Sequence, residues 1–194
     1  MAKVSVVIPC YNEERTITGL LSALLTQTYP LTDFEVVIAD GLSTDGTREV
    51  IDQFKHQNPQ LRLLVVDNQP RNIPSALNKA IAHCEGEIII RLDAHAVPAD
   101  DYIEKCVSDL ESGMGDNVGG VWLIRPPADQ FFARAIALAA AHRLGVGDAR
   151  YRYSDKAGLV DTVPFGCFYR ATLDSVGGYD ETLLTNEDYE LNTR

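Results

Sequence analysis

The chain has 194 residues, 45% of them hydrophobic and 23% charged, which suits one packed domain and not a disordered or fibrous protein. Its formal net charge is −11, from 17 Lys and Arg against 28 Asp and Glu. This excess of acidic residues argues against nucleic acid as a partner, because binding to the phosphates of its backbone requires clustered basic side chains. A nucleoside diphosphate can still bind to an acidic protein if a metal ion lies between their charges.

Cysteine usage and the chain start point to a reducing compartment. No CxxC pair and no zinc-ligand spacing occurs among the four cysteines, so we predict free thiols. These are Cys10, Cys84, Cys106 and Cys167. Met1–Val4 runs directly into a strand-like segment, without the pattern of a secretion signal. The longest apolar stretch, Phe131–Val146, is interrupted by basic residues and is too short to span a bilayer unaided. We therefore predict a cytoplasmic protein.

Strand-like runs alternate with helical patterns in the first half of the chain. Continuous apolar, mostly β-branched runs predict buried strands at Val4–Pro9, Phe34–Ala39, Leu61–Val66 and Glu87–Leu92. Apolar residues at helical spacing predict helices after Ile17, after Thr47 and over Ile73–Cys84. This alternation predicts an α/β fold with a Rossmann-like, mostly parallel central sheet and helices on both faces.

The carboxyl edge of such a sheet is where ligands bind, because right-handed crossovers place all the parallel strand ends there. The polar residues just past the predicted strands are Asn12, Glu13, Asp40 and Asp93. These residues are the first candidates for a functional site.

The regular alternation loosens after Asp93. We predict, in order, a helix over Ala99–Glu111, a strand at Gly120–Ile124, a helix over Gln130–Leu144, a mobile loop at Gly145–Lys156, short strands at Val160–Val163 and Cys167–Arg170, and a small helix at Thr172–Val176. Trp122 is predicted to lie in the core, with an acceptor platform as the alternative. The apolar stripe that begins at Phe131 is also predicted to be core, with a membrane-surface helix as the alternative.

Two short motifs could carry chemistry. Asp93 and His95 are two potential ligands directly after a strand, and a carboxylate with an imidazole suits Mn²⁺ or Mg²⁺. Asp40 could accept hydrogen bonds from a base or ribose, and the glycines beside it let a flat ligand approach. The structural alternatives are that Asp93 caps a turn and that Asp40 is a solvated strand end. No GxGxxG motif and no Walker A lysine follows the first strand.

Three carboxylates cluster in Asn186–Glu190. Such a run is typical of a helix start, where the helix dipole favours acidic residues. A carboxylate at the mouth of a cleft could equally be the general base that transfer to a hydroxyl requires.

Taken in order, four segments resemble the inverting family 2 glycosyltransferases, which have the GT-A fold. The segments are Val6–Glu14, Ala39–Thr47, Arg91–His95 and Asn186–Asp188. Their spacing fits the family over essentially the whole chain. Arg91–Ala96 further resembles the branch that includes succinoglycan and exopolysaccharide glucosyltransferases.

The resemblance assigns roles residue by residue. The nucleotide-binding residues would be Pro9, Tyr11, Glu13 and Asp40. The metal ligands would be Asp93 and His95, where His95 replaces the last Asp of the family's Asp-x-Asp motif and would ligate directly, through water, or not at all. Asp188 would be the catalytic base. The acceptor-side residues would be Glu187, Gly166, Tyr169 and Arg170.

The implied reaction is transfer of a hexose from a nucleotide sugar, with UDP expected, to a hydroxyl of a glycan or lipid-linked saccharide. It would use Mn²⁺ or Mg²⁺ and invert the anomeric centre. We expect one catalytic domain over 1–194, with a nucleotide-binding half (1–98) and an acceptor-side half (99–194), truncated at its C-terminus. Membrane contact at the inner face of the plasma membrane would come from a missing C-terminal segment. The alternatives are a sugar nucleotidyltransferase and a degenerate, non-catalytic nucleotide-sugar-binding module.

Overall fold

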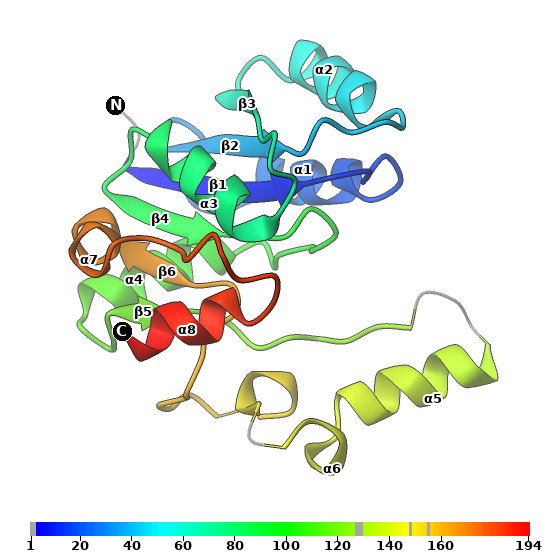
Figure 1. The fold of residues 1–194 in the computed structure, drawn as a ribbon, viewed down its shortest axis with the longest axis vertical. Coiled ribbons are helices and arrows are strands. Elements are labelled where there is room, and N and C mark those ends of the chain that lie inside the picture. The colour runs from blue at the N-terminus through cyan, green and yellow to red at the C-terminus, as the bar shows by residue number, and fades with distance from the viewer. Residues whose placement is uncertain (1–2, 127–129, 148, 155) are drawn as a thin grey trace.

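A mixed six-stranded sheet forms the centre of the computed structural model, which describes residues 3–126, 130–147, 149–154 and 156–194 (Figure 1). The strand order is β3-β2-β1-β4-β6-β5. The first four strands are parallel, and β6 runs antiparallel to β4 and β5. Their bounds are β1 (Val4–Cys10), β2 (Phe34–Asp40), β3 (Leu63–Asp67), β4 (Ile88–Arg91), β5 (Asn117–Val118) and β6 (Cys167–Tyr169). The predicted mostly parallel α/β sheet is confirmed.

Helices cover both faces of this sheet. The helices of the described residues are α1 (Ile17–Leu25), α2 (Thr47–Gln57), α3 (Ile73–Ala82), α4 (Tyr102–Glu111), α5 (Phe131–Ala140), α6 (Arg143–Val146), α7 (Arg170–Val176) and α8 (Glu187–Thr193), with a 3-10 turn at Arg150–Arg152. Apolar residues of α1, α2 and α4 pack on one face, and those of α3, α7 and α8 pack on the other. Successive strand residues point to opposite faces, so each strand supplies both layers.

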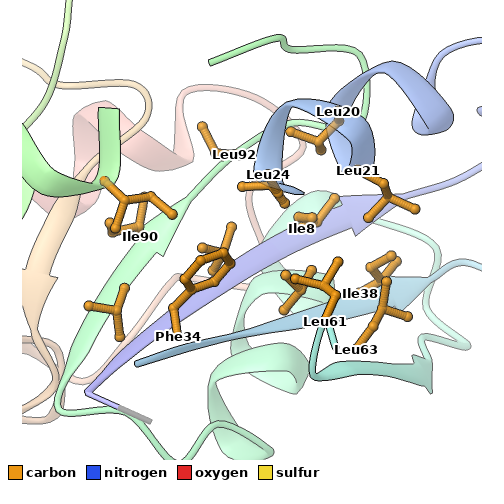
Figure 2. Packing of buried hydrophobic residues seen from close by; sticks show 14 of the residues in the cluster. Ile8, Leu20, Leu21, Leu24, Phe34, Ile38, Leu61, Leu63, Ile90 and Leu92 are labelled. Carbon is orange, nitrogen blue, oxygen red and sulfur yellow. The ribbon is translucent and has the colours of Figure 1, made fainter. Parts of the chain in front are cut away.

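The larger core layer explains why the first half of the chain folds as predicted (Figure 2). Leu20, Leu21 and Leu24 of α1 are fully buried against the sheet, where Ile8 and Ile38 meet them from β1 and β2. Burying a large aliphatic side chain contributes roughly 1.5–3 kcal/mol. These contacts fix the sheet and, with it, the loops that follow β1, β2 and β4.

Two predicted strands are absent from the described chain. Residues 120–124 and 160–163 pair with no strand of the sheet. After β5 the chain turns away at Gly119, which lies so close to the Phe165 carbonyl that a side chain there would collide with it. Trp122 then donates its backbone N–H to Tyr151 at 2.7 Å instead of joining a ladder. Apolar composition predicted a strand correctly only where a neighbouring strand was available for pairing.

The prediction that the α5 stripe belongs to the core is wrong. Of the residues in α5, only Ala137 is buried, and both phenylalanines at its start are exposed. Trp122 is also outside both core layers and is half-buried, in contact with Tyr151 and Phe165. Figure 1 shows the reason: α5 and α6 project away from the sheet.

The predicted helix Gln130–Leu144 is broken into α5 and α6, and His142 caps α6 by accepting a hydrogen bond from the Leu144 N–H. The predicted loop Gly145–Lys156 contains the end of α6 and the 3-10 turn, while residues 148 and 155 within it lie outside the described residues. Within the described ranges, every helix falls short of the length and apolarity that crossing a bilayer requires.

Candidate active site at the carboxyl edge of the sheet

A cleft opens beyond the carboxyl ends of β1, β2 and β4, and its empty volume, which includes space open to solvent, is about 570 Å³. Five of the predicted site residues line it: Pro9, Tyr11, Glu13, Asp93 and His95. The loop after β3 and the start of α3 add Asn68, Arg71, Asn72, Ile73 and Ala76. The structure therefore gathers residues from four separate segments around one cavity.

Tyr11 forms one wall of the cleft. Its ring lies against Gly41, where a Cβ atom would come within 3.1 Å of the ring, so the glycine makes this close approach possible. The Arg71 guanidinium lies 5.8 Å from the centre of the same ring. Arg71 and Asn12 both adopt positive φ angles, of 60° and 55°, which costs energy for residues other than glycine. A cation and an aromatic ring thus face the same cavity.

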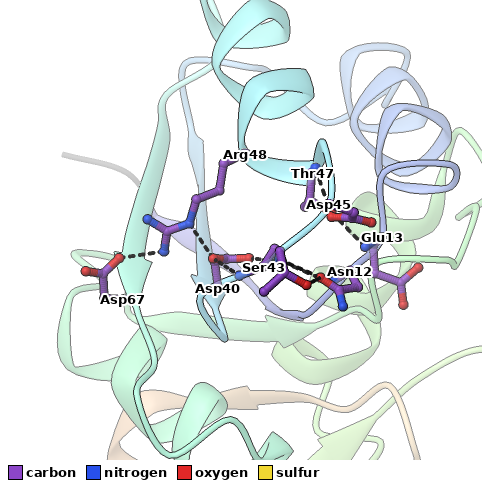
Figure 3. Close-up of polar contacts among 9 residues, drawn as sticks. Asn12, Glu13, Asp40, Ser43, Asp45, Thr47, Arg48 and Asp67 are labelled. Carbon is purple, nitrogen blue, oxygen red and sulfur yellow. Dashed lines mark hydrogen bonds and ion pairs between the residues drawn. The ribbon is translucent and has the colours of Figure 1, made fainter.

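Asp40 is fully buried beneath this wall and is already paired with protein groups (Figure 3). Its carboxylate accepts hydrogen bonds from the Ser43 N–H at 3.0 Å and from the Ser43 hydroxyl. It also forms an ion pair with Arg48 Nε at 2.5 Å. Arg48 also bridges to Asp67 at the end of β3 at 2.6 Å. Asp40 is not a lining residue of the cleft, whereas its neighbour Gly41 is. In this structure Asp40 stabilises the conformation of the loop after β2.

Glu13 and His95 meet across the cleft mouth. Glu13 Oε1 lies 3.1 Å from His95 Nδ1, and the Glu13 backbone N–H donates to the Thr47 hydroxyl at 2.8 Å. A carboxylate at Nδ1 favours the tautomer with the proton on Nδ1, which leaves the Nε2 lone pair available to a metal. The imidazole is 61% exposed, so it can turn toward a ligand.

Whether these groups suit a divalent metal depends on their donor chemistry. Among the described residues, no three His, Cys, Asp or Glu side chains are gathered as a complete ligand set. Asp93 and Glu13 nevertheless offer carboxylate oxygens, and His95 an imidazole, to the same cleft. Mg²⁺ usually takes only one or two protein carboxylates and completes its shell with substrate phosphates and water. The residues fit a partial shell of that kind.

Arg91 joins the metal motif to the predicted base. It ends β4 with 3% of its surface exposed, and its guanidinium pairs with Asp93 at 3.2 Å, with Glu187 at 3.1 Å and with Asp188. Its backbone N–H donates to the Gly166 carbonyl at 3.0 Å, which fixes β4 against the segment before β6. One buried cation therefore holds three carboxylates, two from the start of α8 and one from the loop after β4.

The electrostatics of this cluster act mainly on Asp188. Burial raises the pKa of the Asp188 carboxyl to about 7, and the negative charges of Glu187 and Asp93 act in the same direction. Arg91 opposes them and lowers this pKa. Burial also raises the pKa of the neighbouring Tyr179 hydroxyl, so this phenol stays neutral beside the cluster. A carboxyl group with a pKa near neutrality is suited to accept a proton.

The four predicted acceptor-side residues do not lie together. Glu187 and Gly166 are next to Arg91, at the carboxyl end of β4. Tyr169 pairs with Ile88 at the opposite, amino end of that strand. Arg170 donates to the Ile81, Cys84 and Gly86 carbonyls, and so caps the end of α3. Antiparallel β6 runs away from the cleft, so Tyr169 and Arg170 lie at the edge of the sheet opposite to Glu187 and Gly166.

Sequence reasoning missed Asn68, Arg71, Asn72 and the role of Arg91. The rule that selected Asp40 and Asp93, polar residues just past a parallel strand, also applies to the residues after β3 and could have found Asn68. Its side chain is buried and binds the Ser75 hydroxyl at 2.8 Å and the Asn72 carbonyl at 3.0 Å, which shapes the cleft wall. Nothing in the sequence signalled that Arg91 would meet Asp188, 97 positions away.

Comparison with known proteins identifies the family to which the chain belongs. The family model described as glycosyl transferase family 2 matches residues 5–177. The chain is 36% identical to the succinoglycan biosynthesis protein ExoA of Rhizobium meliloti over 191 residues, which cover 97% of the chain and 56% of that protein. It is 38% identical over 117 residues to the glycosyltransferase AglE of Haloferax volcanii, over 60% of the chain and 38% of that protein. The chain thus spans about half the length of the curated relatives it matches, or less.

Solved structures show the same fold. A mannosyltransferase from Pyrobaculum calidifontis, in complex with GDP-Man and Mn²⁺, superimposes with a TM-score of 0.73 at 27% identity, over 97% of this chain and 50% of that one. S. aureus TarS 1–349 in complex with UDP superimposes with a TM-score of 0.68 at 22% identity, over 98% and 54%. The predicted GT-A fold is therefore confirmed, and the chain belongs to glycosyl transferase family 2.

Proposed function

We propose that the protein transfers a hexose from a UDP-sugar to a hydroxyl group of a glycan or lipid-linked acceptor, with inversion, in exopolysaccharide biosynthesis. The observation that carries this proposal is the Arg91 cluster. It joins Asp188, a half-buried carboxylate with a raised pKa, through the Arg91 guanidinium to Asp93, which lines the cleft. A base next to the place where a leaving group is held is the arrangement that glycosyl transfer requires.

The cleft wall would hold the nucleotide. The Tyr11 ring offers a flat surface for a base, and Arg71 brings a guanidinium suited to a diphosphate. Asp40 would act through the loop it organises, because Ser43 and Arg48 already occupy its carboxylate. Asp93 and His95, with Glu13 beside them, would hold Mn²⁺ or Mg²⁺. When bound, that ion supplies positive charge that stabilises the departing nucleoside diphosphate.

Asp188 would take the proton from the acceptor hydroxyl, whose oxygen then attacks the anomeric carbon opposite the leaving group. Such a displacement inverts the anomeric configuration. Arg91 would orient the Asp188 carboxylate and favour its ionised form, while Glu187, bound to the same guanidinium, supports this geometry. The roles of Pro9 and Gly166 would be steric, since Pro9 lines the donor cleft and Gly166 leaves room beside β6.

The similar proteins support a nucleotide sugar as the donor, and which nucleotide it contains is to be tested. The TarS structures contain UDP and UDP-GlcNAc, and the mannosyltransferase contains GDP-Man with Mn²⁺. The similarity to ExoA favours exopolysaccharide over other glycans. A thermal-shift panel of UDP-, GDP- and CMP-linked sugars, each with and without Mn²⁺ or Mg²⁺, would identify the nucleotide. Absence of stabilisation by every donor would contradict the donor site.

The decisive experiment is Asp188→Asn. Removing the base should lower transfer by about 10²–10⁴-fold, the usual contribution of general base catalysis, while the donor-induced thermal shift stays as in the wild type. Asp174→Asn, an exposed carboxylate on α7, is the matched control and should leave both unchanged. Turnover by Asp188→Asn at the wild-type rate would remove Asp188 from the base role.

A further inference from the structure

The part of the chain between Val121 and Val160, which we call the arm, exposes an unusual amount of apolar surface. Its described residues include α5, α6 and the 3-10 turn, and Figure 1 shows them projecting from the sheet. Large apolar side chains on the arm are mostly in contact with solvent: Phe131 is 80% exposed, Phe132 77%, Ile136 69%, Leu138 71%, Leu144 92% and Leu159 86%. A concentration of large exposed apolar side chains in one segment points to an interaction site.

The arm also differs in charge from the rest of the protein. Residues 121–160 contain six Arg and Lys against three Asp and no Glu, a net charge of +3. The rest of the chain holds the other 11 basic and 25 acidic residues, a net charge of −14. The basic positions on either side of α5 include Arg125 and Arg143, both exposed. An apolar, basic projection thus extends from an acidic body.

We propose that the arm docks on the surface of an anionic lipid bilayer. Phenylalanine and leucine side chains of a short helix partition into the boundary between headgroups and acyl chains, and nearby arginines bind lipid phosphates. An anionic surface attracts the arm and repels the acidic body, so the charge distribution selects this one face of the molecule for contact. The helix lies in the interface and does not cross it, in agreement with its ten residues.

Charge disfavours a second copy as the occupant. A two-fold symmetric dimer through α5 would bring two basic arms together, because such an interface uses the same patch on both subunits. An uncharged protein surface could bury the apolar side chains of α5 but would offer no negative charge to the basic residues around it. An anionic bilayer offers both an apolar layer and negatively charged headgroups.

The root of the arm connects it to the candidate active site. Trp122 packs on Phe165 and on Tyr151, with ring centres 4.9 and 5.1 Å apart. Phe165 precedes Gly166, whose carbonyl accepts the Arg91 N–H. Docking through the arm would therefore bring the Asp188 side of the cleft close to the bilayer. On the proposed function, on which this step rests, the acceptor would be a saccharide linked to a membrane lipid.

Vesicle flotation of the 194-residue chain tests the docking without donor or metal. We expect the protein to float with phosphatidylcholine vesicles that contain phosphatidylglycerol, to float poorly with phosphatidylcholine alone, and to be released by salt. The variant Phe131→Asn/Phe132→Asn should lower the partition coefficient by about tenfold or more, since each ring buries apolar surface. Arg125→Gln/Arg143→Gln should weaken binding to anionic vesicles alone. Leu184→Asn, which changes a side chain 83% exposed outside the arm, should bind like the wild type.

Three results would overturn the proposal: no flotation with anionic vesicles, equal flotation of the phenylalanine variant, or a dimer in solution that the same variant converts to monomer. Circular dichroism of each variant would verify that it is folded. Asp188→Asn should float like the wild type. Loss of transfer and loss of lipid binding are thereby measured separately, so failure of the proposed function would not be mistaken for failure of the docking.

Discussion

Helices α1 and α5 have similar apolar sequences and opposite surroundings. In α1, Ile17, Leu20, Leu21 and Leu24 are fully buried against β1 and β2. In α5, the large apolar residues at equivalent helical spacing face solvent, and only Ala137 is buried. Helical periodicity therefore predicted two helices and could not predict which one has a partner. The difference is one of tertiary contact, since α1 lies over the sheet while α5 lies beyond its edge (Figures 1 and 2).

The largest expected effect concerns the tie between the sheet and α8. Arg91→Met would leave Asp93, Glu187 and Asp188 without their shared cation, and breaking a buried ion pair in this way costs about 3–5 kcal/mol. Urea denaturation would measure the loss of stability, and transfer should fall with it. Arg91→Lys, which keeps the charge but not the fork of donors, should lose less. A fully stable and active Arg91→Met protein would contradict the role assigned to this residue.

A matched pair of leucines tests the comparison of α1 with α5 directly. Leu21→Ala removes a fully buried side chain and should lower the free energy of unfolding by about 2–5 kcal/mol. Leu138→Ala, at a position 71% exposed, should change it by less than about 0.5 kcal/mol. Chemical denaturation of both variants is the measurement. Equal destabilisation would mean that α5 is buried in solution and that the two helices do not differ.

The raised pKa of Asp188 has a consequence for the pH dependence of transfer. The pKa of Asp188 is raised to about 7, chiefly by burial, so its ionised fraction falls as pH falls through that value. If Asp188 is the base, kcat/KM for transfer should drop about tenfold per pH unit below the pKa and level off above it. In Arg91→Lys the midpoint should move upward, because a less well placed cation stabilises the carboxylate less. A flat profile through neutral pH would be inconsistent with Asp188 as the base.

The smallest expected effect concerns the root of the arm. The Trp122 Nε1–H is buried and has no hydrogen-bond partner among the described residues. Trp122→Phe should therefore cost little, within about 1 kcal/mol, whereas Trp122→Ala loses the contacts with Tyr151 and Phe165. Limited proteolysis should show faster cleavage within residues 121–160 for Trp122→Ala than for Trp122→Phe. Equal cleavage of both variants would show that this aromatic contact does not anchor the arm.

Much of the site could be predicted because its residues follow strands that local sequence specifies. Pro9, Glu13, Asp93 and His95 each lie next to a continuous β-branched run, and a parallel sheet brings the ends of such runs to one edge. Tyr169 and Arg170 are assigned to the acceptor side only by the resemblance of their segment to the family. The antiparallel direction of β6, which the sequence does not encode locally, carries them to the opposite edge.

By itself, then, the sequence determined the buried strands, the helices between them and the order of the family's motifs, because each depends on residues a few positions apart. Tertiary structure alone decided what those elements meet. It placed Arg91 between Asp93 and Asp188, enclosed Asp40 in a network with Ser43 and Arg48, and left the apolar face of α5 in solvent. Each of these outcomes depends on which distant segment provides a partner, and local patterns of hydrophobicity and charge contain no information about that choice.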